Sequence, residues 1–271
     1  MSIPHRIAPT ETGYVVMVPP RMVAPAIKAL DAQDKDAAEG PARETPVPDH
    51  GPSFIGVAMA VTLFAFFVVS GPRAGPDTFG WFRLGSAIAR RIVHEHELWR
   101  VVTALTLHAD IMHVTGNAVA SLIFVTALGR WMGGGIAIFT TLMAGTLGNL
   151  LTAFIYSTTH NSVGASTATF GALGILGGLQ FVRRFRDTSV GRLKRGLLGI
   201  AAALGFLAML GMGERSDVVA HFAGLGFGIL TGVGLALYLK RPVRILGQAI
   251  CLLATVGLLT GAWLLAFSGH R

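Results

Sequence analysis

The sequence predicts an all-α polytopic membrane protein, because long apolar segments recur along it and charges collect between them. Of its 271 residues, 52% are hydrophobic, 13% are charged and 35 are glycine. This composition is typical of a helical bundle in lipid and atypical of a water-soluble globule. Strands are excluded for these segments, because apolar and polar residues do not alternate and lipid leaves an open sheet edge unpaired.

Seven apolar segments are long enough, or nearly so, to cross a bilayer as helices. They cover residues 53–70, 111–129, 132–156, 165–182, 197–211, 218–239 and 245–267. The fifth is short for a span. Most of the 22 Lys and Arg residues fall in segments on the same side as the N-terminus. By the positive-inside rule we expect a cytoplasmic N-terminus and a multi-pass protein of the cell (inner) membrane.

The segments outside the predicted spans differ in kind. Residues 1–52 mix prolines with charges and predict a flexible cytosolic extension, with room for a short helix over residues 24–33. The connection 71–110 is too long for a simple turn, so we expect a structured outer loop. Its Trp99 and Arg100 could also anchor at the lipid headgroups. The net charge of +8 is explained by the Lys and Arg residues that collect on one side of the membrane, so nucleic-acid binding is not expected.

Four polar residues lie where predicted spans begin at the outer face. Ser166 opens the fourth span, and His221 lies near the start of the sixth. His113 and Asn117, four residues apart, share one face of the second. Each alone has a structural alternative, because serine lets helices pack closely and histidine or asparagine can hydrogen-bond a neighbouring helix. Alternate spans run in the same direction, so the four share one depth, which favours a common functional site.

These residue types predict acyl-transfer chemistry. A serine becomes a strong nucleophile when a base takes its proton, and His221 can do this near neutral pH. No Asp or Glu lies within a predicted span, so we expect a Ser166–His221 dyad rather than a triad. The candidate oxyanion donors are His113, Asn117 and the backbone N–H of Ser166. No cluster of metal ligands accompanies the histidines, and neither a metal nor a cofactor is expected.

Other small or polar residues in the spans predict packing. Gly224, Gly228 and Gly232 recur every four residues and form a strip that lets another helix approach closely. Asn149, among glycines of the third span, predicts a contact between helices without a catalytic role. His108, just before the second span, is interpreted as an interfacial residue.

These separated motifs resemble those of the rhomboid family of intramembrane serine proteases over residues 97–239. The matching residues are Trp99 and Arg100 in the outer loop, His113 and Asn117 in the second span, Gly164, Ser166 and Phe170 in the fourth, and Ala220, His221, Gly224 and Gly228 in the sixth. One position departs from the family pattern. Thr167 follows the serine, where the family commonly has glycine, and its β-branched side chain adds bulk at that point.

The resemblance implies that Ser166 is the nucleophile and His221 the base, with an aromatic residue, Phe170, packed against that base. It makes His113 and Asn117 the oxyanion donors. It also implies a six-helix rhomboid-like core, which we place over residues 53–239, followed by an additional C-terminal helix in residues 240–271.

The resemblance further implies that the substrates are single-span transmembrane proteins, cut near the outer face of the bilayer. We expect them to enter laterally beside the short fifth span. One alternative is a rhomboid-like protein without catalysis that binds membrane clients. Another is a transporter with a polar path, but this would predict repeated halves, and the sequence has no clear internal repeat. No motif in the sequence bears on oligomeric state.

Overall fold

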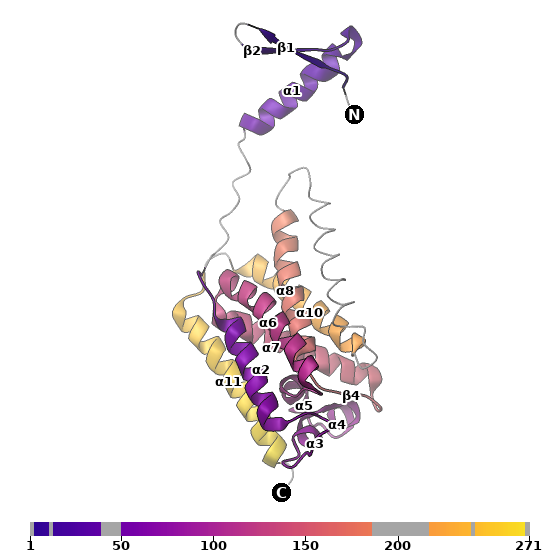
Figure 1. The fold of residues 1–271 in the computed structure, drawn as a ribbon, viewed down its shortest axis with the longest axis vertical. Helices are drawn as coiled ribbons and strands as arrows, with labels where there is room; N and C mark the ends of the chain where they lie inside the picture. Colours follow the sequence, from indigo (N-terminus) through magenta and orange to yellow (C-terminus); the bar gives the residue numbers. More distant parts are fainter. Residues whose placement is uncertain (1–2, 11–12, 39–49, 186–216, 240–241, 269–271) are drawn as a thin grey trace. The chain divides into compact units, whose positions relative to one another are not determined.

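The computed structural model describes residues 3–10, 13–38, 50–185, 217–239 and 242–268 (Figure 1). Its chain divides into two compact units, Met1–Pro46 and Val47–Arg271.

The first unit contains a hairpin and a helix. The antiparallel strands are β1 (Arg6–Thr10) and β2 (Gly13–Met17), and the helices are η1 (Pro20–Met22) and α1 (Val23–Ala38). The sequence predicted only a flexible extension with a short helix over 24–33. The hairpin is therefore an addition, favoured by the aromatic and β-branched residues of β2, and the helix is longer than expected. Whether the extension as a whole is flexible stays a prediction.

The second unit is a helical bundle, which confirms the predicted fold class. Its long helices are α2 (Ile55–Ser70), α6 (Ile111–Met132), α7 (Gly134–Tyr156), α8 (Ser166–Phe185), α10 (Val218–Tyr238) and α11 (Ile245–Ser268). Four of them, α6, α7, α10 and α11, are long and apolar enough to cross a membrane, while α2 and the apolar part of α8 are shorter. The protein is thus an integral multi-pass membrane protein. The fifth predicted span, 197–211, lies outside the described residues.

Two aspartates set where α6 and α10 begin. The Asp110 side chain accepts a hydrogen bond from the backbone N–H of His113 at 2.9 Å. Asp217 does the same for the N–H of Ala220 at 3.1 Å. Both are N-caps, which satisfy amides that have no partner within the helix.

The connection between α2 and α6 is structured, as the sequence predicted. It contains α3 (Trp81–Gly85), β3 (Ala87–Ile88), α4 (Ala89–His94), α5 (Arg100–Thr103) and η2 (Ala104–Thr106). Strand β3 pairs with β4 (Asn161–Ser162), from the connection between α7 and α8. These elements gather at one end of the bundle, which we call the loop end (Figure 1).

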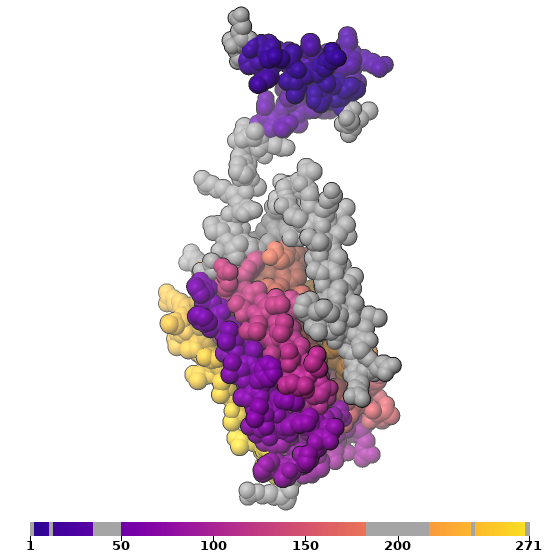
Figure 2. All heavy atoms as spheres, in the orientation of Figure 1, coloured from indigo at the N-terminus to yellow at the C-terminus, as the bar shows by residue number. Residues whose placement is uncertain are grey.

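The C-terminal helix α11 is attached to the bundle near both of its ends. Near its start, the Gln248 side chain donates to the carbonyl of Met132 at 2.6 Å and accepts from the N–H of Ile136 at 3.0 Å. Near its other end, Nε1 of Trp263 donates to the hydroxyl of Thr106 at 3.3 Å. Figure 2 shows α11 in yellow along the edge of a face formed by α2 and α6, which pack against each other.

Helices α8 and α10 make the most extensive helix–helix contact in the described part of the chain. The predicted glycine strip of α10 lies in this contact, where an added Cβ would overlap a carbonyl oxygen of α8. The overlapping pairs are Gly224 with Thr167, Gly228 with Gly171, and Gly232 with Ile175. Glycine at these positions therefore lets the two backbones touch.

Two glycines of α10 provide a matched test of this contact. A Cβ at Gly228 meets the α8 backbone, whereas a Cβ at Gly226 meets no atom within 4 Å. We expect Gly228→Ala to lower the unfolding free energy by about 1–3 kcal/mol, the usual cost of overpacking. Gly226→Ala should leave it unchanged or raise it by up to about 1 kcal/mol, because alanine favours helix. Thermal unfolding in detergent measures both, and equal shifts in the two variants would contradict this account of the contact.

Candidate active site

The four polar residues singled out from the sequence lie in three helices that begin at the loop end. Ser166 is the first residue of α8 and is half-buried, whereas His221 in α10 is only 2% exposed. His113 is half-buried in α6, and Asn117 of the same helix is 4% exposed. Within the described residues, no three His, Cys, Asp or Glu side chains form a metal-binding group.

The segment that leads into α8 lies against His113 and passes near Asn117, the two candidate oxyanion donors. The N–H of Gly164 donates to the carbonyl of Ala104 in η2 at 2.9 Å. A Cβ at Gly164 would lie 2.5 Å from Cε1 of His113 and 3.7 Å from Nδ2 of Asn117. Its φ of +129° is also a conformation that residues with a side chain rarely adopt. Glycine here thus lets the backbone just before Ser166 lie against His113.

Phe170 connects the serine helix to the candidate base. Its ring stacks on the ring of His221, with centroids 4.5 Å apart and planes inclined by 25°. Phe170 and Ser166 are four residues apart in α8, so they share one helix face, and His221 lies over that face. Nδ1 of His221 is buried and has no hydrogen-bond partner among the described residues.

No hydrogen bond joins the side chains of Ser166 and His221 within the described part of the chain. In serine hydrolases such a bond is often long or misaligned until a substrate is bound, so a bond between these two side chains stays a prediction.

The amide of Asn117 has an unused donor. Its Nδ2 is buried and has no partner among the described residues, while its backbone carbonyl accepts from the hydroxyl of Ser121 at 2.7 Å. A buried donor without a partner is costly. It is explained if a substrate oxygen accepts from it during the reaction. By contrast, Nδ2 of Asn149 donates to the carbonyl of Val101 at 3.0 Å, which confirms the predicted packing contact.

His108 belongs to this region, and its interpretation as an interfacial residue was wrong. Its side chain is fully buried, and its Nε2 accepts the N–H of Ala165 at 3.4 Å. Its ring meets that of His113 edge-on, with centroids 5.2 Å apart. Burial lowers the pKa of His108 to about 3, and nearby His113 acts in the same direction, so His108 is neutral and can accept. The one feature of the sequence that could have indicated burial is the position of this histidine in an otherwise uncharged stretch.

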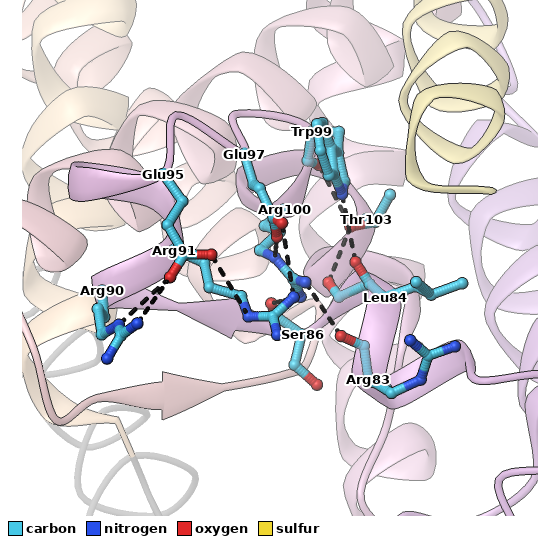
Figure 3. Close-up of polar contacts among 11 residues, drawn as sticks. Arg83, Leu84, Ser86, Arg90, Arg91, Glu95, Glu97, Trp99, Arg100 and Thr103 are labelled. Atoms are coloured by element: carbon cyan, nitrogen blue, oxygen red, sulfur yellow. Dashed lines mark hydrogen bonds and ion pairs between the residues drawn. The ribbon is translucent and has the colours of Figure 1, made fainter. Parts of the chain in front are cut away.

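Arg100 is a structural residue of the loop end and does not reach the lipid headgroups. Its guanidinium is fully buried and donates to the carbonyls of Ser86 and Arg83, each at 3.0 Å, and to the carboxylate of Glu97 (Figure 3). Nε1 of the neighbouring Trp99 donates to a carbonyl of α3 at 3.3 Å. The headgroup interpretation is therefore wrong for Arg100, because a buried cation needs these acceptors.

Glycines in the two neighbouring helices leave room for the side chain of Thr167, the residue that follows Ser166. Thr167 is buried and faces two glycines. A Cβ added at Gly148 would lie 2.6 Å from Cγ2 of Thr167, and one added at Gly224 would lie 3.0 Å from it. Its added bulk therefore fills space between α7 and α10.

A family model described as a Rhomboid domain matches residues 95–238, more than half of the chain. The chain belongs to the rhomboid family. The residues of the candidate site lie within the matched rhomboid domain, apart from Arg83, Ser86 and the helix α3, which Arg100 and Trp99 contact.

Named rhomboid relatives share this domain at moderate identity. RHOMBOID-like protein 1 of Arabidopsis thaliana is 29% identical over 171 residues, 63% of this chain and 42% of the relative. Rhomboid protease GluP of Bacillus subtilis (strain 168) is 30% identical over 124 residues, which cover 46% of this chain and 24% of the relative. Putative rhomboid protease YdcA of the same organism is 28% identical over 158 residues, which cover 57% of this chain and 72% of the relative. The chain thus spans less than half the length of the first two relatives.

The neutral His108 gives this rhomboid domain an acid-sensitive stability. Unfolded His108 binds a proton below its ordinary pKa of 6.5, whereas the folded residue binds one only near pH 3. The unfolding free energy therefore falls as pH drops from about 6.5 towards 3. We expect His108→Gln, which retains an acceptor but does not titrate, to flatten this slope in thermal unfolding at a series of pH values. Identical slopes in the two proteins would contradict the assignment.

Proposed function

We propose that the protein is an intramembrane serine endopeptidase in which Ser166 is the nucleophile and His221 the base. The observation that carries this proposal is the position of the start of α8. Through Gly164 it lies against His113 and Asn117, and through Phe170 its serine-bearing face lies against His221. Membership in a family that includes named proteases supports the same reaction.

The proposed reaction uses groups from α6, from the start of α8 and from the first turn of α10. His221 takes the proton of the Ser166 hydroxyl as its oxygen attacks a peptide carbonyl. It then gives that proton to the leaving amine as the C–N bond breaks and the acyl-enzyme forms. The negative oxygen of the intermediate accepts hydrogen bonds from Nδ2 of Asn117, from His113 and from the backbone N–H of Ser166. That N–H is available because the first amides of a helix have no partner within it. The neutral His221 then takes a proton from a water that attacks the acyl-enzyme, and it returns this proton to the Ser166 oxygen as the acid product leaves.

The proposed substrates are single-span transmembrane proteins. A helix hides its carbonyls in backbone hydrogen bonds, so a substrate must unwind locally before Ser166 can attack it. Unpaired backbone groups cost several kcal/mol in lipid, so cleavage is favoured near the membrane surface, after a small residue and close to Gly, Pro or polar residues. With a cytoplasmic N-terminus this is the outer face. The predicted entry beside the fifth span, 197–211, lies outside the described residues.

The first test removes the nucleophile and the base. We expect Ser166→Ala and His221→Ala each to abolish cleavage of a transmembrane substrate in proteoliposomes, and the double variant to be no worse than either alone, because both serve one proton transfer. Labelling by a fluorophosphonate should disappear in Ser166→Ala and persist in Ser70→Ala, which alters a buried serine of α2. Cleavage by purified Ser166→Ala protein would exclude the proposed nucleophile, and a wild-type protein that neither cleaves nor labels would point to a non-catalytic rhomboid.

The second test separates catalysis from packing with two buried asparagines. We expect Asn117→Ala to lower kcat by about 10²–10³-fold with a smaller effect on KM, the usual cost of losing one oxyanion donor. Asn149→Ala, which removes a donor already bonded to Val101, should lower the unfolding temperature without a comparable loss of kcat. The same pattern in both variants would make Asn117 a packing residue.

A further inference from the structure

A hydrogen bond between two side chains at the loop end joins the two segments that carry Ser166 and His221. Nε2 of His160 and Oδ2 of Asp217 are 2.6 Å apart, and both side chains are largely buried. His160 precedes β4 in the segment that leads to Ser166, and Asp217 is the N-cap of α10. The two residues are 57 positions apart in the chain, so the contact is a tertiary one.

His160 is held in place from three directions. Its ring stacks on that of Tyr156 at the end of α7, with centroids 4.3 Å apart and planes inclined by 14°. Its carbonyl accepts the N–H of Ala89 at 2.9 Å, and the next residue, Asn161, pairs with β3. The imidazole is therefore a fixed point of the loop end, and β4 connects it directly to the segment before Ser166.

Asp217 transmits the contact to the first turn of α10. Its Oδ1 accepts from the N–H of Ala220, and its backbone carbonyl accepts from the N–H of His221 at 3.0 Å. Burial alone would raise the pKa of Asp217, but the hydrogen bond and charge of His160, together with the N–H of Ala220 and the hydroxyl of Ser162, lower it below its ordinary value. The carboxylate is thus ionised, and it holds the turn that carries His221.

The contact between His160 and Asp217 restrains sliding and rotation of α10 relative to α8, which the glycine packing opposes only weakly. Backbone contact between α8 and α10 fixes how close the helices lie, but van der Waals contact alone opposes small sliding or rotation weakly. A charge-assisted hydrogen bond is directional and stronger than a neutral one. Because the bond between His160 and Asp217 lies at the end of α10 that carries His221, it would fix the position of the His221 ring relative to the start of α8.

We propose that His160 and Asp217 are positioning residues, a latch that sets the place of His221 relative to Ser166. The latch rests on the proposed protease function, since it acts on the proton transfer between these two side chains. Neither latch residue touches the substrate. A shift of about 1 Å in a reacting pair costs on the order of 100-fold in rate, so loosening the latch should slow the reaction of a protein that is still folded.

Two substitutions weaken the latch and retain the other contacts of each residue: the first removes its hydrogen bond, and the second removes the negative charge that strengthens it. His160→Phe retains a ring to stack on Tyr156, and Asp217→Asn retains an N-cap acceptor for the N–H of Ala220. The control is Glu95→Gln, which removes a more exposed ion pair with Arg90 in another connection of the loop end, between α2 and α6. The measured quantities are the rate of fluorophosphonate labelling, which requires no transmembrane substrate, together with kcat, KM and the unfolding temperature.

We expect each latch variant to label about 10–100-fold more slowly and to lose kcat by a similar factor, with KM little changed. The double variant should be no slower than the slower single variant, because both substitutions remove one contact. Glu95→Gln should label at the wild-type rate.

Three results would overturn the latch. The first is wild-type labelling in His160→Phe and Asp217→Asn, even if their unfolding temperatures fall, because the pair would then be structural only. The second is a double variant whose loss is the product of the two single losses. The third is an equal loss in Glu95→Gln. If the wild-type protein is labelled and Ser166→Ala is not, these results leave the proposed protease function standing, whereas absence of wild-type labelling refutes both.

Discussion

The close approach of α8 to α10 is the constraint on which the rest of the site depends. Carbonyl oxygens of α8 occupy the space that side chains would fill at Gly224, Gly228 and Gly232. In lipid, helices gain little from burying apolar surface against each other, so contact between backbones is a main source of attraction. Because Ser166 begins one of these helices and His221 lies in the first turn of the other, the glycine spacing sets how near the two can come.

The loop end adds a second constraint, which acts on the backbone before the serine. The buried guanidinium of Arg100 needs several acceptors, and it finds them in Glu97 and in carbonyls of the preceding turns. This network fixes α5 and hence η2, whose Ala104 carbonyl holds the N–H of Gly164. Charged residues in a membrane protein commonly mark function. Here a buried charge instead shapes the segment that supports the candidate nucleophile.

Helix α11 is part of the body of the protein, although from the sequence it was only an additional helix after the core. Its Gln248 satisfies two backbone groups where α6 passes into α7, and Gly133, with a φ of +87°, leaves room for that side chain. Trp263 fills the space beside Gly85 and reaches Thr106. Gln248 thus bonds backbone groups at one end of the membrane helices, and Trp263 bonds the Thr106 hydroxyl at the loop end.

The sequence by itself determined the helices and which polar residues begin them, because span length, glycine spacing and the cost of polar groups in lipid are local properties. The predicted spans that fall in described residues agree with the observed helices to within a few positions. Tertiary structure decided the burial of His108 and Arg100 and the pairing of His160 with Asp217. His108 with Ala165, and His160 with Asp217, are each contacts 57 residues apart. No periodicity relates such partners, so only the packing of the helices brings them together.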